Sequence, residues 1–450
     1  MNEHFLIPEF VISILEFLRS YNAQAFLVGG CVRDMLMQRD LHDYDIATSA
    51  KAENMLSWFS QAGYKALPTG IKHGTITVLL DEEPVEITTY RIDQSYQNHR
   101  SPDQVVFTAH IEDDLKRRDF TMNAIAFHPK IGIIDPHHGQ EDIRQGIVRC
   151  VGDPMVRFEE DALRMLRALR FSSQLRFEIE SNTWNAIQVH HQDLKYVSKE
   201  RISDEFNKIL MASKVNTLRM LRDANILLEI IPDYASLYDY KQPTKWHIYD
   251  VFTHTDVALN HTTEDSLYVK LAIVFHDIGK PLCCTIDEQG SAHYKGHALQ
   301  SQRIAQHYLK ELHYDNATIQ RVCDLILYHD YYVKPTRKVL RKYLSKFSND
   351  VGLAFEALDV QIADNHGKNP ELAQALIDNV LECKAMISLM EEEKDILHKK
   401  DLALNGHDVM RLGYTGKEIG EVLSMLYEWV LEDPTWNTKE ALLKRLQKMK

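Results

Sequence analysis

The spacing of apolar and polar positions differs between the beginning of this chain and the part after about residue 180. Short apolar runs at residues 26–28, 73–81 and 85–91 are separated by turn-forming residues and predict the strands of a sheet. Residues 8–20 have apolar positions at helical spacing, which predicts an amphipathic helix packed on that sheet. From about residue 180 onward the spacing is helical almost throughout. The pattern predicts an α+β fold, with a small mixed-sheet head followed by an elongated all-helical region.

The stretch 26–48, FLVGGCVRDMLMQRDLHDYDIAT, carries the first candidate chemistry. Gly29 and Gly30 follow an apolar strand, and glycine lets the backbone turn tightly and approach a ligand. Asp43 and Asp45 are two residues apart, so in a strand their carboxylates would share one face. Adjacent carboxylates repel each other unless a cation lies between them, and oxygen ligands together with phosphates suit Mg²⁺. The stretch predicts nucleotidyl or phosphoryl transfer from a nucleoside triphosphate, the alternative being a glycine turn followed by solvated acids.

A second dense motif, DDLKRRDFTMNAIA, occupies residues 113–126. If the motif is helical, Asp119 and Asn123 lie four residues apart on one face and can hold ribose hydroxyls. Arg118 can then reach a phosphate group. A charged helix face without a ligand is the alternative. Glu86, on a predicted strand, either adds a third acid to the metal site or faces solvent.

Residues 157–171, RFEEDALRMLRALRF, predict a single strong helix. Asp161 and Arg164 are three residues apart on it, so an acceptor and a donor would face the edge of one base. Such a pair can satisfy C or A while leaving polar groups of G or U unpaired, at about 1–3 kcal/mol each. The alternative is a simple salt bridge worth about 0.2–0.5 kcal/mol. Arg167 and Arg170 are candidates for phosphate or RNA contacts.

These motifs carry a resemblance to a known family. GGCVRD followed by DYDIAT, then RRDFTMNA and EDALRMLRALRF, resembles the class II polymerase-β-type nucleotidyltransferases, which include CCA-adding enzymes and bacterial poly(A) polymerases. The resemblance implies template-independent addition of CCA to the 3′ end of tRNA from CTP and ATP. It implies catalytic Asp43 and Asp45 holding Mg²⁺. The nucleotide-binding residues that it implies are Gly29, Gly30, Arg33, Arg118, Asp119, Asn123, Asp161, Arg164, Arg167 and Arg170.

Residues 246–367 carry a separate set of candidate metal ligands on or beside apolar helical stretches. Neutral imidazoles combined with carboxylates suit a transition metal such as Mn, Fe, Ni or Zn. The ordered set resembles the HD phosphohydrolase superfamily and implies attack of metal-activated water on a phosphoester, in a phosphatase or phosphodiesterase. A structural body that only retains a metal is the alternative. The implied ligands are His254, His276, Asp277, His297, His329 and Asp364.

Composition limits the remaining choices. A length of 450 residues predicts several domains, and the net charge of −13 argues weakly against nucleic-acid binding, although locally basic runs exist. Six cysteines without C-x-x-C spacing fit a reducing, cytoplasmic location, and neither a signal peptide nor a spanning segment is expected. A homodimer is left open. The predicted domains are a nucleotidyltransferase head (1–145), a helical neck selecting nucleotide and RNA (146–235), an HD-type metal-binding body (236–395) and a tRNA-binding helical tail (396–450).

Three alternative functions remain at this stage. A poly(A) polymerase shares the head motifs, but the acidic balance and the N-G-x-D-V-M pattern of the tail, which resembles Gram-positive CCA-adding enzymes, argue against it. A partial enzyme adding only CC or only A has nearly the same motifs. The polar segment 92–103 is predicted to be a surface loop or a mobile flap with Arg100 near substrate. The resemblance implies a flexible loop at this place in CCA-adding enzymes, so the segment favours full CCA addition. The third alternative is an HD hydrolase with an RNA-binding head.

Overall fold

The chain folds into two compact units. Residues 1–212 with 220–230 form the first unit, and residues 213–219 with 231–450 form the second. No helix in the described part of the chain combines the length and apolar character needed to cross a membrane. The computed structural model describes residues 7–41, 43–80, 83–97, 101–212, 216–262, 266–395 and 398–448, with the backbone alone at 93–97 and 101–104.

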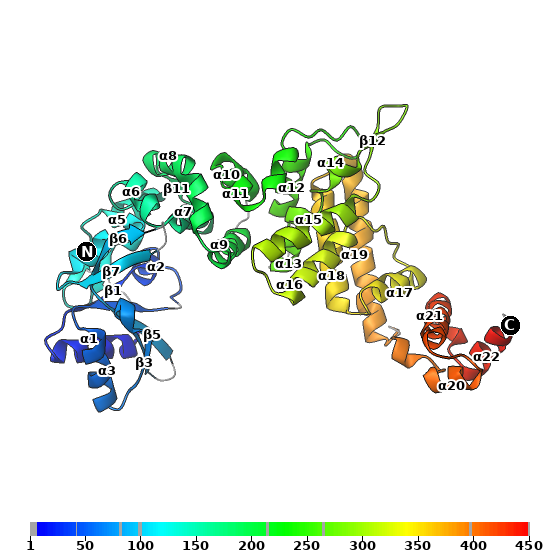
Figure 1. Ribbon diagram of the computed structural model, residues 1–450, viewed down its shortest axis with the longest axis horizontal. Helices are drawn as coiled ribbons and strands as arrows, with labels where there is room; N and C mark the ends of the chain where they lie inside the picture. Colours follow the sequence, from blue (N-terminus) through cyan, green and yellow to red (C-terminus); the bar gives the residue numbers. More distant parts are fainter. Residues whose placement is uncertain are drawn as a thin grey trace. The chain divides into compact units, whose positions relative to one another are not determined.

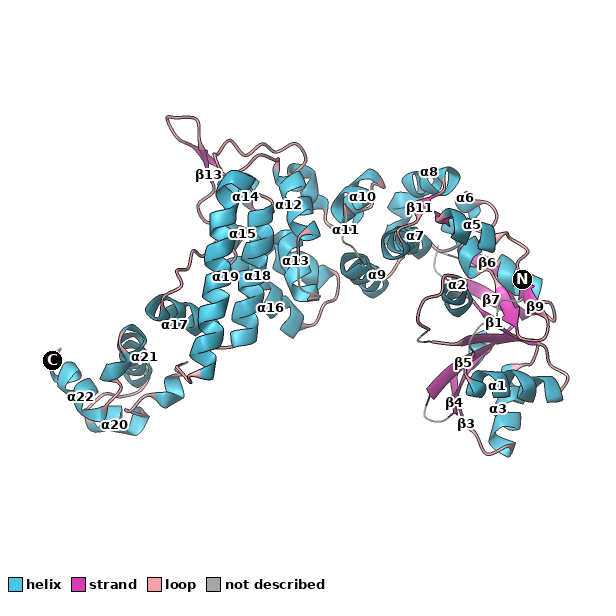
Figure 2. Cartoon of the chain, turned by 180° about the vertical axis from the view of Figure 1, so that it is seen from behind, coloured by secondary structure: helices cyan, strands magenta, loops and turns pink. Residues whose placement is uncertain are grey.

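A seven-stranded mixed sheet forms the centre of the first unit (Figures 1 and 2). Its strand order is β3-β4-β5-β2-β1-β8-β9. Only β2 and β5 pair in parallel, and the other neighbours are antiparallel. The strands are β1 (Ala25–Val28), β2 (Asp45–Thr48), β3 (Lys65–Gly70), β4 (Thr75–Leu80), β5 (Glu83–Thr89), β8 (Ala126–His128) and β9 (Gly132–Ile134).

Helices cover both faces of this sheet, which explains why β1 is apolar at every position. Leu27 belongs to a core shared with α1 (Glu9–Ser20) and α3 (Ala52–Gln61), whereas Phe26 and Val28 belong to a core shared with α4 (Ile111–Lys116). Side chains alternate across a strand, and burying each large apolar one contributes about 1.5–3 kcal/mol. The predicted helix at 8–20 is confirmed as α1. The helices of the head are α1 (Glu9–Ser20), α2 (Gly30–Leu36), α3 (Ala52–Gln61), α4 (Ile111–Lys116) and α5 (Gly139–Gln145), with 3₁₀ turns η1 (Ile71–His73) and η2 (Thr121–Asn123).

The segment predicted to be a polar loop instead forms most of a two-stranded ribbon. Strands β6 (Arg91–Gln97) and β7 (Ser101–Phe107) pair in antiparallel register from Arg91 opposite Phe107 to Gln97 opposite Ser101. Backbone hydrogen bonding holds such a ribbon without the apolar alternation that marks a half-buried strand, so periodicity misses it. Arg100 lies outside the described residues.

Both helices predicted across the nucleotide motifs are interrupted. Helix α4 ends at Lys116. Asp119 lies in a turn beyond it, and the Asp119 carboxylate accepts a hydrogen bond from the backbone N–H of Phe120. The predicted helix at 157–171 is split at Asp161 into α6 (Pro154–Glu160) and α7 (Leu163–Leu175). In both places an aspartate side chain bonds a nearby backbone N–H, which competes with helix formation. The remaining elements of the first unit are α6 (Pro154–Glu160), α7 (Leu163–Leu175), α8 (Ser181–His190), η3 (His191–Tyr196), α9 (Lys199–Ala212), α11 (Leu227–Ile230) and the parallel pair β10 (Ile147–Val148) and β11 (Glu178–Ile179); α10 (Thr217–Asp223) spans the unit boundary.

The second unit is almost wholly helical, so the predicted α+β class is confirmed. Helix α13 is its apolar centre, with every residue from Val269 to Phe275 buried. The elements are η4 (Pro232–Ser236), α12 (Val251–Asn260), α13 (Leu267–Phe275), α14 (Lys280–Cys283), β12 (Thr285–Ile286), β13 (Ala292–His293), α15 (His297–Glu311), α16 (Asn316–Leu327), α17 (Arg337–Lys346), α18 (Val351–His366) and α19 (Pro370–Glu392).

The end of the chain has an apolar core of its own. Val409, Leu426 and Leu442 belong to this core, which the last three helices share. An ion pair of 2.8 Å between Lys342 on α17 and Glu432 on α21 (Lys417–Glu432) connects these helices to the rest of the second unit. The elements of this region are η5 (Lys399–Asp401), α20 (Gly406–Arg411), α21 (Lys417–Glu432), η6 (Pro434–Trp436) and α22 (Lys439–Gln447).

Candidate functional site

Gly29 lies at the turn between β1 and α2, where a side chain would not fit. Its φ of +75° favours glycine. A Cβ atom here would lie 2.9 Å from Arg118 Nη1 and 3.8 Å from Asp45 Oδ2. One at Gly30 would lie 3.7 Å from Arg33 Nη2. The first turn therefore brings residues from two predicted motifs, 26–48 and 113–126, to one place.

Acidic residues gather at the start of β2. Asp45 is the first residue of this strand and lies opposite Glu86 of β5. Asp43 precedes the strand, because pairing with β5 begins at Asp45, so the prediction that both aspartates lie in the strand is wrong. Burial raises the pKa of Asp45; Arg118 opposes this, and the charges of Glu86 and Asp43 raise it further. A divalent cation would relieve the repulsion, and carboxylate oxygens suit Mg²⁺.

Arg118 is held in place by a buried carboxylate. Asp114 Oδ2 accepts a hydrogen bond of 3.2 Å from Arg118 Nη2, and Oδ1 accepts one of 2.7 Å from Arg117 Nη2. Burial alone would raise the pKa of Asp114, but these two guanidinium groups lower it below its usual range. The ionised carboxylate therefore fixes the direction in which Arg118 approaches Gly29.

A buried hydrogen-bond chain connects the glycine motif to α7. Arg33 Nη1 donates to Asn123 Oδ1 at 2.9 Å, and Asn123 Nδ2 donates to Asp119 Oδ1 at 3.2 Å. The second oxygen of Asp119 lies 2.6 Å from Arg167 Nη2. Burial would raise the pKa of Asp119, but Arg167 and Asn123 lower it to about 2. Asp119 and Asn123 thus lie together as predicted, although no single helix carries them.

Phe171 lies among three of the predicted arginines. The guanidinium carbons of Arg170, Arg33 and Arg167 lie 4.3, 5.1 and 5.4 Å from the centre of its ring. The negative face of an aromatic ring attracts cations, so the ring offsets part of the repulsion among these groups. Arg170 Nε also pairs with Glu205 Oε2 at 2.8 Å. Sequence reasoning missed Phe171, which is one residue beyond Arg170.

Asp161 and Arg164 lie at the interruption between α6 and α7, where each has a charged partner. Arg164 Nη1 lies 2.6 Å from Glu160 Oε2, and Arg164 Nη2 donates to the Arg117 carbonyl at 3.1 Å. Asp161 Oδ2 lies 2.9 Å from Arg201 Nη2. The two side chains that are predicted to read a base are therefore held by different elements rather than by one helix.

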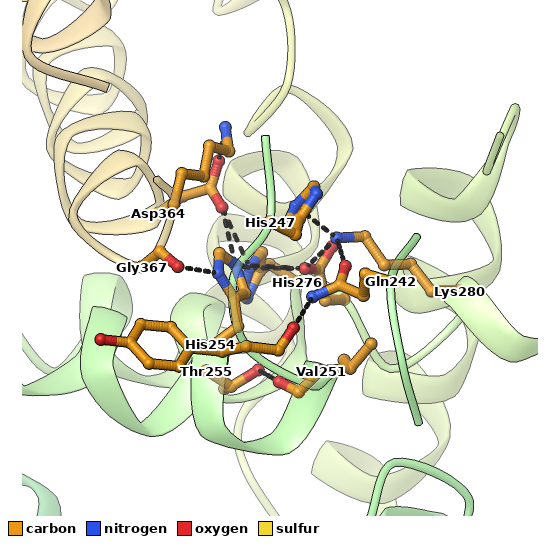
Figure 3. Close-up of polar contacts among 12 residues, drawn as sticks. Gln242, His247, Val251, His254, Thr255, His276, Lys280, Asp364 and Gly367 are labelled. Carbon is orange, nitrogen blue, oxygen red and sulfur yellow. Dashed lines mark hydrogen bonds and ion pairs between the residues drawn. The ribbon is translucent and has the colours of Figure 1, made fainter. Parts of the chain in front are cut away.

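The predicted ligands of the second site converge in the second unit, where Figure 3 shows His254, His276 and Asp364 directed toward one another. Asp277 shares its two oxygens between two groups. Its Oδ2 lies 3.3 Å from His254 Nε2 and 3.1 Å from His276 Nε2. Its Oδ1 lies 3.4 Å from His297 Nε2 and 3.7 Å from His329 Nε2. Each group has its ligand atoms within 4.8 Å of one another; they are His254, His276, Asp277 and Asp364, and Asp277, His297 and His329.

The four imidazoles of this cluster are oriented by the same kind of hydrogen bond. Their Nδ1 atoms lie 2.7–2.9 Å from the backbone carbonyl oxygens of Gly367, Ile273, Tyr294 and Ile326. A carbonyl only accepts, so Nδ1 carries the proton and a neutral ring directs the Nε2 lone pair inward. Two pairs of Nε2 atoms face each other at 3.2 and 3.1 Å. Facing lone pairs repel each other unless a proton or a metal ion lies between them, and nitrogen with carboxylate donors fits a transition metal.

Two lysines lie beside the cluster, and neither was a sequence-based candidate. Lys280 Nζ lies 2.5 Å from Asp277 Oδ2, and Lys368 Nζ lies 2.7 Å from Asp364 Oδ2. Burial would raise the pKa of Asp277, but His276 and Lys280 hold it well below its usual range. The spacings i,i+3 and i,i+4 from the predicted aspartates could have identified both lysines. A cavity of about 150 Å³ adjoins the cluster, lined by His329, Gln361, Asp364, Lys368 and Asn379 among others.

Comparisons with known proteins cover almost the whole chain. Family models described as "Poly A polymerase head domain", "Probable RNA and SrmB-binding site of polymerase A" and "tRNA nucleotidyltransferase domain 2" match residues 25–149, 176–237 and 297–446. The CCA-adding enzyme of Lactobacillus johnsonii is 31% identical over 441 residues, or 97% of each chain. That of Lactobacillus helveticus is 45% identical over 222 residues, which are 49% of this chain and 55% of that enzyme.

Solved structures agree with this similarity. The Bacillus stearothermophilus CCA-adding enzyme in complex with CTP has a TM-score of 0.75 at 26% identity, with 99% of each chain covered. The Thermotoga maritima CCA-adding enzyme complexed with tRNA has a TM-score of 0.59 at 19% identity, covering 99% of this chain and 97% of that one. The latter likeness concerns the fold alone.

Proposed function

Because this chain belongs to the class II CCA-adding enzyme family, we propose that it adds C, C and A to the 3′ end of tRNA from CTP and ATP. The observation that carries the proposal is the approach of Asp45 and Arg118 to the Gly29 turn. At this turn the Asp45 carboxylate can bind a metal ion and the Arg118 guanidinium can bind a phosphate. Gly29 has no side chain that would keep a ligand away from the backbone. This combination suits transfer from a nucleoside triphosphate.

The acids of this site would hold the catalytic cation. Asp43 and Asp45 supply carboxylate oxygens, and Glu86 lies within reach of the same place through its register with Asp45. Mg²⁺ bound there would supply activation of the tRNA 3′-hydroxyl and charge neutralisation of the triphosphate. The 3′-oxygen would form a bond to the α-phosphorus while its proton passes to water, the bond from the α-phosphorus to the oxygen bridging the α and β phosphates would break, and pyrophosphate would leave with the electron pair.

The arginines around Gly29 would bind and orient the triphosphate. Hydrogen bonds to Asp114 and Asn123 orient the guanidinium groups of Arg118 and Arg33, respectively. Fixed guanidinium groups lose little freedom on binding, and their charge-assisted hydrogen bonds to phosphate are strong. Asp119 and Arg167 act mainly by holding this arrangement, because each is already paired with the other.

Base selection would fall to Asp161 and Arg164. Cytosine and adenine each present an amino donor beside a ring-nitrogen acceptor, which complements a carboxylate next to a guanidinium. Uracil and guanine present the opposite order and would leave buried polar groups unpaired, at about 1–3 kcal/mol each. The tRNA end would supply the remaining contacts.

The decisive experiment supplies tRNA that lacks its CCA end together with labelled CTP and ATP, singly and combined. Incorporation in the order C, C, A supports the proposal. Incorporation of CC only or A only would indicate a partial enzyme, and long A tails would indicate a poly(A) polymerase. Absence of any incorporation by folded protein would refute nucleotidyl transfer altogether.

The histidine cluster favours a second function, a metal-dependent HD-type phosphohydrolase in the second unit. Its support is the inward orientation of four imidazoles around Asp277, which divides its oxygens between two groups. A transition metal bound there would supply an activated water. Lys368 lines the adjoining cavity and would place positive charge next to a phosphoester there, while Lys280 pairs with Asp277. Metal analysis of the purified protein tests binding, and hydrolysis of p-nitrophenyl phosphate and 2′,3′-cyclic AMP tests activity.

A further inference from the structure

The cavity beside the histidine cluster adjoins both groups of candidate metal ligands. Its volume is about 150 Å³, and it is lined by His329, which belongs to one group, and by Asp364, which belongs to the other. Two amide side chains line it as well, namely Gln361 on α18 and Asn379 on α19. A molecule in this cavity would therefore lie against the cluster and against two amides.

The nitrogens of both amides are already used by the backbone. Gln361 Nε2 donates to the carbonyl oxygens of Tyr328 and Tyr331 at 3.2 and 3.1 Å. Asn379 Nδ2 donates to the Val333 carbonyl at 2.8 Å. Because a carbonyl oxygen only accepts hydrogen bonds, the nitrogen of each amide has to face the backbone. The orientation of both amides is therefore fixed.

The oxygens of the two amides remain as acceptors. Within the described part of the chain, no group donates a hydrogen bond to Gln361 Oε1 or to Asn379 Oδ1. An amide oxygen can accept from a ligand but cannot donate to one. A ligand without donors would leave both oxygens unpaired, which is unfavourable away from water. A ligand with hydroxyl groups would satisfy both.

One donor of Lys368 is available to a ligand in the same cavity. Its Nζ donates to Asp364 Oδ2 at 2.7 Å and to Asn365 Oδ1 at 2.8 Å. An ammonium group has three donors, so one remains for an anionic oxygen. Leu376 and Val380 also line the cavity and can contact the carbon atoms of a ligand. The lining thus combines a cation, two acceptors and apolar carbon.

The size of the cavity limits what it can enclose. A water molecule in the liquid takes about 30 Å³, so the cavity of about 150 Å³ has room for about five of them. Pockets for drug-sized ligands measure about 300–1,000 Å³. A phosphoryl group with a short carbon chain fits this space, whereas a nucleobase in addition does not.

We propose that this cavity selects phosphoesters of small polyhydroxy alcohols, such as sugar phosphates, with Gln361 and Asn379 accepting hydrogen bonds from the hydroxyl groups of the alcohol. The inference rests on the proposed phosphohydrolase function of the second unit and names its substrate class. In the reaction, the oxygen of water forms a bond to phosphorus and the bond from phosphorus to the alcohol oxygen breaks. The alcohol oxygen keeps the electron pair and takes a proton from the water.

The binding test uses two phosphonates that resist hydrolysis and differ only in hydroxyl groups, 3,4-dihydroxybutylphosphonate and n-butylphosphonate. Isothermal titration calorimetry with the full-length chain loaded with Mn²⁺ gives the Kd of each. We expect the dihydroxy compound to bind about tenfold more tightly, the factor of two modest hydrogen bonds. In Gln361→Met and in Asn379→Leu this ratio should fall about threefold, because each variant removes one acceptor. A purely structural effect would weaken both compounds equally.

A matched control is Gln374→Met, which removes an exposed amide of α19 that donates to Asp378. Its ratio of Kd values should equal that of wild type. Hydrolysis adds a second comparison, in which kcat/KM for 5′-AMP should not exceed that for ribose 5-phosphate. A higher value for 5′-AMP would mean that the base is recognised, and it would overturn the inference.

The failure of the inference can be distinguished from the failure of the phosphohydrolase proposal. Equal Kd values for the two phosphonates in wild type overturn the inference even if p-nitrophenyl phosphate is hydrolysed. Unchanged ratios in Gln361→Met and Asn379→Leu overturn it as well. The expected Kd ratios without hydrolysis of any phosphoester would support the binding site and refute the phosphohydrolase function.

Discussion

Asp45 and Glu86 lie directly opposite each other on the parallel strands β2 and β5. The Glu86 charge raises the pKa of Asp45, so the two carboxylates interact. We expect Glu86→Gln to raise the Mg²⁺ concentration for half-maximal CCA addition about tenfold, because one oxygen ligand and one charge are lost. Titrating activity with Mg²⁺ measures this. Glu83→Gln, at the start of the same strand, is the control, and an equal shift in both variants would contradict the assignment.

Asp45→Asn should abolish nucleotide addition while leaving the histidine cluster intact. It removes the carboxylate that faces Gly29 and Arg118, and loss of a metal-binding charge in a transfer site costs about 10³-fold or more in rate. Incorporation of labelled CTP measures the loss. His276→Ala should do the reverse, reducing metal content in the second unit with addition retained. If either substitution removes both properties, the two sites are not independent.

Metal stoichiometry should separate the two groups of the histidine cluster. Asp364 belongs to one group, His329 to the other, and Asp277 to both. Asp364→Ala and His329→Ala should each lose about one of two bound metals, whereas Asp277→Asn should lose both, because bridging carboxylates serve both sites. Elemental analysis after loading with Mn²⁺ and gel filtration measures this. His293→Ala, at an exposed hairpin histidine paired with Asp287, should retain both metals. Equal losses in all variants would refute the bridging role.

The sequence predicted which motifs carry chemistry better than it predicted their local geometry. Apolar runs identified those strands of the mixed sheet whose side chains enter the cores on its two faces. The helix interruption at Asp161 was missed, since its cause is a side-chain contact to Leu163 N and to distant Arg201. No periodicity records such contacts. The ribbon formed by β6 and β7 was missed for a related reason, because its pairing does not depend on alternating apolar residues.

For the candidate sites, residue types were predictable and their partners were not. The six expected ligands were chosen from ordered His and Asp residues on apolar stretches, and the structure places their side chains in two groups that share Asp277. Lys368 lies four residues after the predicted Asp364, so that spacing could have identified it, but it was overlooked. Phe171 gave no such signal, because its place beside three arginines arises only from packing. The roles assigned to these residues remain predictions.

The ion pair between Asp119 and Arg167 should make the free energy of unfolding depend on pH. The pKa of Asp119 is lowered from 3.8 to about 2, so its contribution is present above pH 4 and is lost as pH falls toward 2. The shift corresponds to about 2 kcal/mol. Scanning calorimetry of wild type and Asp119→Asn at pH 5 and pH 3 should show the difference in midpoint shrinking with acidity. Arg167→Gln should show the same convergence, and a difference that stays constant would contradict the pair.

Phe171→Leu should weaken nucleotide binding as well as stability. Leucine keeps most of the apolar volume but removes the ring that faces Arg33, Arg167 and Arg170. Three guanidinium groups then repel one another without the ring quadrupole, at a cost of about 0.5–1 kcal/mol for each lost cation–π contact.

Because Arg33 would lose part of its support, the KM for ATP should rise several-fold along with a lower melting temperature. Steady-state kinetics with tRNA ending in CC and thermal unfolding measure the two effects. Phe158→Leu, at a fully buried ring of α6, should lower the melting temperature with KM unchanged. If both variants change only stability, Phe171 is a packing residue and the arginines are ordered by their ion pairs alone.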